Sequence, residues 1–137
     1  MRQLYISELS NLTGISKRTL HHYDHIDLIK PSLGNNASNG YRLYSEEDLL
    51  KLRQVISLKA FGFKLAQIKN MLDPKLDLSV PLKKQLELLE KRTKAFNEVN
   101  KILQEVISSY HVNKKVSWEE VIKRIETYRN LYNHMKK

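Results

Sequence analysis

Hydrogen-bond donors gather on one side of a short segment near the N-terminus, residues 15–26. Ser16 can accept a backbone hydrogen bond at the start of a helix. Leu20, Tyr23 and Ile26 then recur three residues apart, which gives that helix one buried stripe. The other side would present donors suited to phosphate oxygens and to base edges in the major groove of DNA. Those donors are Lys17, Arg18, Thr19, His21 and His22, and on their own they fit an ordinary solvated face equally well.

The preceding residues predict the element that positions this helix. Residues 6–12 form a short helix, and Thr13, Gly14 and Ile15 form a tight turn in which Gly14 can adopt positive φ. Two helices joined by a three-residue turn that contains glycine are typical of a helix-turn-helix.

Composition favours a polyanionic partner and excludes several kinds of site. The 137 residues carry a formal net charge of +9, although the basic excess is spread along the chain. Cysteine is absent, which removes disulfides, thiolate metal sites and cysteine nucleophiles. We find no catalytic grouping, no metal-ligand spacing and no phosphate loop, so we expect neither an enzyme nor a metal or cofactor site. Residues 1–5 lack the apolar core of a signal peptide, and no apolar run approaches bilayer length, so we expect a cytoplasmic protein.

A wing and two further helices follow the helix-turn-helix. Pro31 ends the helical periodicity and residues 41–44 alternate as a short strand does. We therefore expect Ile29 and Lys30 to pair with residues 41–43 in a two-stranded wing. A capping box at residues 45–48 then begins a helix that ends near Gly62, and another helix covers residues 64–72.

The apolar period changes from Ser79 onward. Seam positions alternate by four and three residues, as in the a/d pattern of a coiled coil. A helix of this length spans about 45 Å, more than a small domain covers, so self-association is favoured over folding back on the chain's own domain. The seam consists of Leu82, Leu86, Leu89, Thr93, Phe96, Asn100, Leu103, Ile107 and Tyr110.

A second capping box at residues 117–120 predicts a final helix with an apolar stripe that reaches Met135. Its aromatic residues have two interpretations: they pack this helix onto the coiled coil, which is favoured, or they form a small ligand site across a dimer. The residues after the coiled coil are too few to enclose a ligand pocket alone. The aromatic residues concerned are Tyr110, Trp118, Tyr128 and Tyr132.

These elements predict a mainly α chain in three parts. Residues 1–74 form a winged helix-turn-helix DNA-binding domain, residues 75–112 form a long dimerising coiled-coil helix, and residues 113–137 form a short C-terminal helix. The competing function is that of a coiled-coil interaction or adaptor protein without specific DNA binding.

The order of elements and four sequence motifs resemble the MerR family of bacterial transcription regulators. The motifs are residues 13–24, 28–31, 39–45 and 62–69, and the resemblance covers roughly residues 4–72 closely. Where the family usually has Arg-Tyr-Tyr-Asp, this chain has His21-His22-Tyr23-Asp24. That departure is similar to the multidrug-responsive subgroup of Mta and TipA, whose large effector domain has no counterpart here. Metal and redox sensors that resemble the family use cysteines, so those branches are disfavoured.

The resemblance implies a homodimer with an antiparallel coiled coil. It further implies that the dimer binds a pseudo-palindromic operator in a promoter with an over-long spacer, and distorts it so that RNA polymerase can engage both promoter elements.

The resemblance also implies roles for individual residues. Arg18 and His21 match positions of the recognition helix that face DNA, and Tyr41 and Arg42 match wing residues that grip the backbone. Lys59 and Lys64 match a second wing near phosphate, although Lys59 also fits a plain solvated lysine. Tyr23 fits a core residue as well as a DNA contact, and adjacent His21 and His22 diverge too far on a helix to form a metal pair. The complete predicted DNA-binding set is Ser16, Lys17, Arg18, Thr19, His21, His22, Tyr23, Tyr41, Arg42, Lys59 and Lys64.

Overall fold

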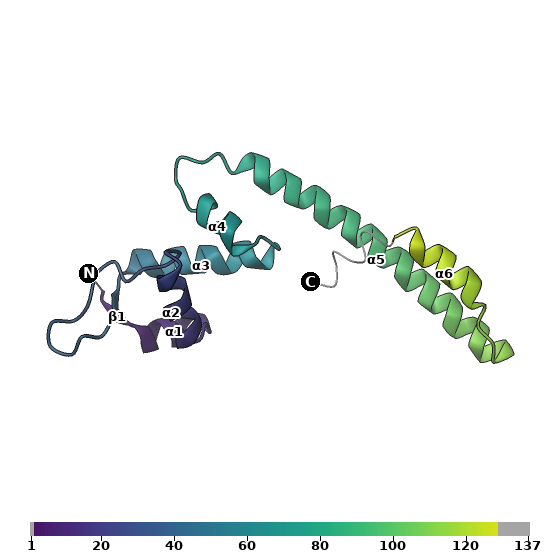
Figure 1. Cartoon of the computed structure of the whole chain (residues 1–137), viewed down its shortest axis with the longest axis horizontal. Helices are drawn as coiled ribbons and strands as arrows, with labels where there is room; N and C mark the ends of the chain where they lie inside the picture. The colour runs from purple at the N-terminus through teal and green to yellow at the C-terminus, as the bar shows by residue number, and fades with distance from the viewer. Residues whose placement is uncertain (1, 129–137) are drawn as a thin grey trace. The chain divides into compact units, whose positions relative to one another are not determined.

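Helix-forming stretches separated by turns make the chain mainly helical, as the sequence predicts (Figure 1). The computed structural model describes residues 2–128, and the chain divides into two compact units between Leu78 and Ser79. Within the described residues, no helix has both the length and the apolar character needed to cross a membrane.

Local capping fixes the helix-turn-helix of the first unit. Gly14 adopts φ 76° after the first helix, and its N–H donates to the Ser10 carbonyl oxygen at 2.8 Å. Ser16 Oγ accepts from the Thr19 N–H at 3.1 Å and so starts the second helix. Both predictions are confirmed. The elements of this unit are β1 (Leu4–Tyr5), α1 (Ile6–Thr13), α2 (Lys17–His25), β2 (Leu43–Tyr44), α3 (Glu46–Ala60) and α4 (Leu65–Met71).

One hydrophobic core holds these elements together. Leu20 and Tyr23 of α2 are almost completely buried, and Ile26 packs against the same core, so the predicted stripe is confirmed. The core therefore holds α2 by its apolar side and leaves its donors on the surface. The largest fully buried side chains are Tyr23, Tyr44, Leu4, Leu9, Leu20, Ile29, Leu52, Ile68 and Val55.

The predicted pairing of the wing is wrong. β2 pairs antiparallel with β1, with Leu4 opposite Tyr44 and Tyr5 opposite Leu43. Ile29 cannot join a ladder with residues 41–43, because its N–H donates to the Tyr23 carbonyl oxygen at 3.2 Å and its side chain lies in the core.

The wing loop instead closes through residues 33–36. The Leu33 N–H donates to the Leu43 carbonyl oxygen at 3.2 Å, and the Leu43 N–H donates to the Gly34 carbonyl oxygen at 2.9 Å. An isolated bridge then joins Asn35 to Arg42. Arg42 is thus fixed by its backbone at the base of the wing.

A buried carboxylate ties the wing to α3. Asp48 and Ser45 form the predicted capping box, with Ser45 N–H donating to Asp48 Oδ2 at 2.9 Å. The same oxygen accepts from the N–H of Ser32 at 3.0 Å and from its hydroxyl at 2.7 Å. α3 ends at Ala60, and Gly62 in the following turn adopts φ 99°.

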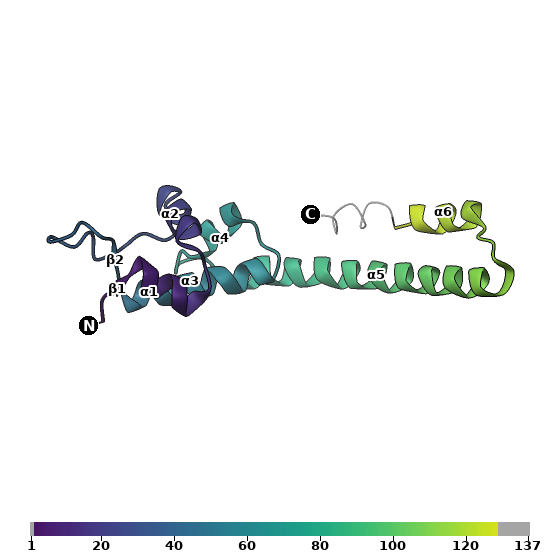
Figure 2. The ribbon, with the colours of Figure 1, turned by 90° about the horizontal axis from the view of Figure 1, so that it is seen from below.

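The second unit is a helical hairpin. α5 (Ser79–Asn113) is followed by a turn at Lys114, and α6 (Trp118–Glu126) runs back alongside α5 (Figure 2). Ser117 makes no capping hydrogen bond, because its backbone (φ −81°, ψ 86°) is not in the extended conformation of a capping residue. The predicted capping box at residues 117–120 is therefore wrong. Residues 129–135 of the predicted final helix lie outside the described residues.

α5 carries two neighbouring apolar faces. One faces α6 through Ile102, which is buried, and Val106, which is half-buried. The predicted coiled-coil seam lies one position further along the helix, and Leu103 and Ile107 on it are 56% and 60% exposed. α6 therefore covers the face of α5 that contains Ile102, and this face is not the predicted seam.

Candidate nucleic-acid interface

The polar side of α2 presents the predicted donors to solvent. Lys17, Arg18, His21 and His22 are exposed and Thr19 is half-buried. The hydroxyl of Ser16 is already used locally, because it also donates to Thr19 Oγ1 at 2.9 Å. Ser16 thus fixes where the helix starts.

Tyr23 lies in the core rather than on the exposed side of α2. Its side chain is only 2% exposed, so its ring is a core residue rather than a surface contact for DNA. Its hydroxyl oxygen nevertheless lies 3.5 Å from Lys59 Nζ, which connects α2 to the last turn of α3.

The wing places an aromatic ring and a guanidinium beside α2. Tyr41 is 63% exposed, and its ring meets the ring of Tyr5 edge to face at a centroid distance of 6.2 Å. Asn36 Nδ2 donates to Tyr5 Oη at 2.9 Å, which ties the wing loop to β1. Arg42 Nε donates to Asp24 Oδ2 of α2 at 2.9 Å.

Four predicted residues from these two elements share one hollow. Lys17 and His21 of α2 and Tyr41 and Arg42 of the wing line a recess of about 570 Å³, together with residues 5–8 at the start of α1. Lys17 and Arg42 give the recess two cationic side chains against the one carboxylate of Glu8, and this positive excess on a basic chain suits a phosphodiester backbone.

Lys59 and Lys64 flank the turn between α3 and α4. Lys59 is exposed and reaches the Tyr23 hydroxyl, as described above. Lys64 precedes α4, where its N–H donates to Gln67 Oε1 at 2.9 Å, and its side chain is exposed. The two ammonium groups thus lie at the ends of a turn that contains Gly62.

Three charged residues that sequence reasoning missed support this surface. Asp24 Oδ1 accepts from Lys30 Nζ at 3.1 Å, while its other oxygen holds Arg42. Lys69 Nζ donates to the carbonyl oxygen of Ile26 at 3.1 Å and so joins α4 to the end of α2. Asp24 and Arg42 are separated by 18 positions, and no periodicity in the sequence connects them.

The ion pairs shift the pKa values of Asp24, Asp27 and Lys30, and the hydrogen bond from Lys30 lowers that of Asp27. Partial burial would raise the pKa of Asp24, but the hydrogen bonds from Arg42 and Lys30 outweigh it and place this pKa below its usual value. Hydrogen bonds to Asp27 and then to Asp24 raise the pKa of Lys30. Asp24 is therefore held as a carboxylate between two cations.

In the second unit, two of the four predicted aromatic residues share a hollow. Tyr110 and Trp118 line an open hollow of about 510 Å³ at the turn of the hairpin, and both are more than half exposed. Lys114 Nζ lies 5.5 Å from the centre of the Tyr110 ring. Tyr128 is half-buried and does not line this hollow, and Tyr132 lies outside the described residues.

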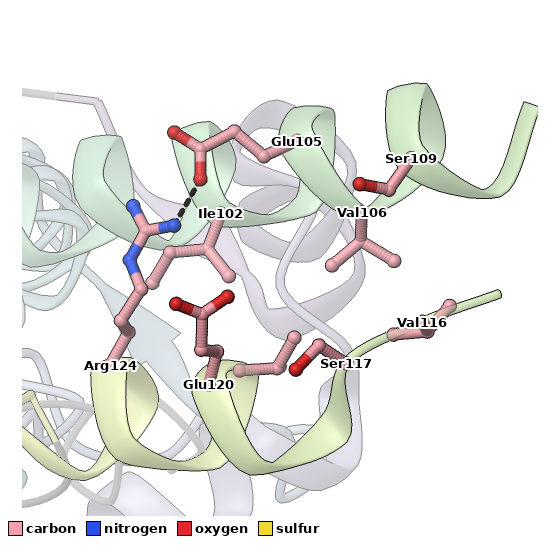
Figure 3. Close-up of a pocket in the computed structure, with 9 residues that line it drawn as sticks. Ile102, Glu105, Val106, Ser109, Val116, Ser117, Glu120 and Arg124 are labelled. Atoms are coloured by element: carbon pink, nitrogen blue, oxygen red, sulfur yellow. Dashed lines mark hydrogen bonds and ion pairs between the residues drawn. The ribbon is translucent and has the colours of Figure 1, made fainter. Parts of the chain in front are cut away.

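A second hollow between α5 and α6 is much smaller. Its volume is about 90 Å³, whereas drug-sized ligands occupy pockets of about 300–1,000 Å³. Figure 3 shows Ile102 and Val106 of α5 facing α6, with the ion pair between Glu105 and Arg124 at its rim. This hollow is a packing space of the hairpin.

Comparison with known proteins identifies the family of the first unit. The family model described as MerR HTH family regulatory protein matches residues 4–75, more than half of the chain. The chain belongs to the MerR family. The resemblance seen in the sequence motifs is thus confirmed.

Individual MerR-family relatives match beyond this domain. The HTH-type transcriptional activator mta of Bacillus subtilis (strain 168) is 43% identical over 95 residues, which are 69% of this chain and 36% of the activator. The crystal structure of MtaN, the N-terminus of the Bacillus subtilis multidrug transporter activator, superposes with a TM-score of 0.66 at 39% identity. That match covers 76% of this chain and 97% of MtaN.

A crystal structure of a MerR-family transcriptional regulator from Bacillus cereus extends the likeness into the second unit. It superposes with a TM-score of 0.71 at 28% identity and covers 93% of this chain and 96% of that one. By contrast, the chain spans little more than a third of the length of the mta activator.

Proposed function

We propose that this chain is a sequence-specific DNA-binding transcriptional regulator of the MerR type, which acts in the cytoplasm as a dimer on a pseudo-palindromic promoter operator. The observation that carries the proposal is the shared cationic recess, in which Lys17 and His21 of α2 meet Tyr41 and Arg42 of the wing. A helix and a wing that present donors to one recess can contact base edges and the adjoining backbone together.

In this docking, the exposed side of α2 enters the major groove. Arg18 is the strongest candidate for a base contact, because a guanidinium can donate two hydrogen bonds to guanine. His21 is a shorter side chain than the arginine usual in the family, so its contact with DNA requires a closer approach. Arg42, Lys59 and Lys64 contact phosphates on either side of the groove and set affinity rather than sequence preference.

The exposed seam of α5 supports the dimer. Leu86, Leu103 and Ile107 are each more than half exposed in the single chain, and they follow the spacing of a coiled coil. An antiparallel pairing of two such helices would set two DNA-binding domains a fixed distance apart. The three-part organisation over residues 1–74, 75–112 and 113–137 serves that arrangement.

Promoter distortion and contact with RNA polymerase complete the proposal. Both follow from family membership, and the basic surface of the first unit supports contact with a bent duplex. The competing function, a coiled-coil adaptor without specific DNA binding, gives the α2 donors and Arg42 no role.

Selection of bound fragments from a pool of random duplexes tests the proposal. We expect a two-fold symmetric consensus, together with a sedimentation coefficient that corresponds to two chains per duplex. A pool that yields no consensus, or a single chain at working concentration, would contradict the proposal and favour the adaptor.

A further inference from the structure

Asp24 is an anion on the side of the molecule that is proposed to meet DNA. Its carboxylate lies at the base of the wing, with a side chain that is 18% exposed. Electrostatics alone would make such a group unfavourable beside a phosphate backbone. Its contacts give it a different role.

The carboxylate holds one edge of the Arg42 guanidinium. Asp24 Oδ2 accepts from Arg42 Nε at 2.9 Å, while Oδ1 accepts from Lys30 Nζ at 3.1 Å. Because Asp24 engages Nε, the N–H donors on the two terminal nitrogens are left to bind a second anion. The arginine side chain is 38% exposed, so a ligand can reach it.

The backbone around both residues is also fixed. Arg42 is bridged to Asn35, and the Asn36 N–H donates to the Tyr41 carbonyl oxygen at 2.7 Å. Asp24 is part of α2, directly after the buried Tyr23. The pair therefore links a rigid helix to a wing whose tip, at residues 37–40, is exposed.

We propose that Asp24 is a positioning residue for DNA binding, which orients the Arg42 guanidinium so that its terminal nitrogens face a backbone phosphate in the recess between α2 and the wing. This inference rests on the proposed function. An arginine without such a partner samples many rotamers, so it loses side-chain conformational entropy when it binds a phosphate. The contact with Asp24 orders the Arg42 side chain in the free protein, so less entropy is lost on binding.

The test measures binding of a fluorescein-labelled duplex that carries the selected consensus. We expect Asp24→Asn to weaken binding about three- to tenfold, although it removes a negative charge from the interface. Combined with Arg42→Ala, the same substitution should cause no further loss, because the residue that it positions is gone. Unfolding curves establish that each variant is folded.

Asp27→Asn is the matched control. Asp27 lies just after the end of α2 and pairs with Lys30 at 2.9 Å, but Arg42 pairs with Asp24 and not with Asp27. It adopts φ 61°, a conformation that asparagine tolerates. We expect this variant to bind as tightly as the wild type or slightly more tightly.

Arg42→Lys gives a second, independent test. A lysine has one ammonium, which Asp24 would occupy, so this variant should bind poorly although it keeps the charge. Adding Asp24→Asn to Arg42→Lys should then restore part of the binding, since the ammonium becomes free for phosphate.

The outcomes distinguish a failure of the proposed function from a failure of the positioning role of Asp24. A wild-type protein that binds no duplex contradicts the proposed function. A wild type that binds, with Asp24→Asn binding equally or more tightly, overturns the positioning role alone. Equal losses from Asp24→Asn with and without Arg42 would also overturn it, because they indicate a general structural effect. In the free protein, 15N spectra of Arg42 Nε should show an N–H that exchanges faster in Asp24→Asn than in the wild type.

Discussion

The two units of this chain bury their apolar side chains to different extents. In the first unit, Leu52 and Val55 of α3 and Ile68 of α4 are fully buried within one core. In the second unit, α5 buries Ile102 but leaves Leu103 and Ile107 largely exposed. The first unit thus has one core of its own, although it leaves Leu50 and Phe61 exposed, whereas the second has an apolar stripe with coiled-coil spacing that fits a further helix.

This difference in burial assigns positioning of α2 and the wing to the first unit and assembly of copies to the second. A domain with a complete core can hold α2 and the wing in fixed positions without help. A helix with an uncovered seam can determine how many copies assemble. Substitutions in each unit test this division.

Truncation in the two units should have unequal effects on folding. We expect Leu52→Ala to lower the free energy of unfolding by about 2–5 kcal/mol, because it leaves a cavity in the core. Leu103→Ala, measured at concentrations where the chain is monomeric, should change it by about 0.5 kcal/mol or less. Denaturant titration provides both values. Equal losses would mean that the seam is covered within the single chain.

A charge on the seam should separate the copies. We expect Leu103→Lys to raise the dissociation constant of the dimer about a hundredfold, since an unpaired ammonium would be buried in the coiled coil. Sedimentation velocity measures it. Lys101→Met, elsewhere on α5, is the control and should leave the dimer intact. If the Leu103→Lys protein remains fully dimeric, the dimer uses another face.

Arg18→Ala should relax base preference. We expect a loss of about 1–3 kcal/mol on the consensus duplex, confined to particular base pairs, if the guanidinium makes a bidentate contact. Competition between duplexes that differ at single positions measures the effect. A loss that is uniform across sequences would reassign Arg18 to phosphate.

Arg42→Ala should act differently from Arg18→Ala. We expect weaker binding to all duplexes and a salt slope that is flatter by about one unit, because one phosphate contact is lost. Titrations over a range of salt concentrations measure the slope. An unchanged slope would place Arg42 away from the backbone.

Acid should affect the two units to different extents. The lowered pKa of Asp24 means that its ion pairs stabilise the fold above the ordinary aspartate range and that this contribution disappears as pH falls below about 4. Asp24→Asn should therefore make unfolding less sensitive to acid. A hydrogen bond from Arg124 also lowers the pKa of Glu105, but both side chains are well exposed, so Glu105→Gln should change little. Thermal unfolding between pH 3 and pH 6 compares the two variants.

Local signals in the sequence predicted most of the first unit. Ser16, Gly14 and the Ser45–Asp48 pair act within a few residues, so type and spacing alone indicate where helices begin and end. The wing pairing failed because Ile29 is needed to close the end of α2, a competition that depends on the folded core.

In the candidate site, too, local features could be predicted from the sequence and contacts between distant segments could not. The donors of α2 were predictable, because a period of three or four residues separates an exposed side from a buried one. The contact of Asp24 with Arg42 was not, since it joins segments that only the fold brings together. On α5, the spacing of apolar residues predicted the seam. The neighbouring face around Ile102 could be identified only from the structure, because it is defined by its packing against α6.

The carboxylate of Asp48 has a mechanical consequence. It accepts hydrogen bonds from Ser32, where the wing loop starts, and from Ser45, where α3 starts. The start of the wing loop and the first turn of the fifteen-residue helix α3 therefore share one hydrogen-bond acceptor, so a displacement of Ser32 should also displace the first turn of α3. Together with the ion pair between Asp24 and Arg42, this oxygen couples the wing to two helices, α3 and α2.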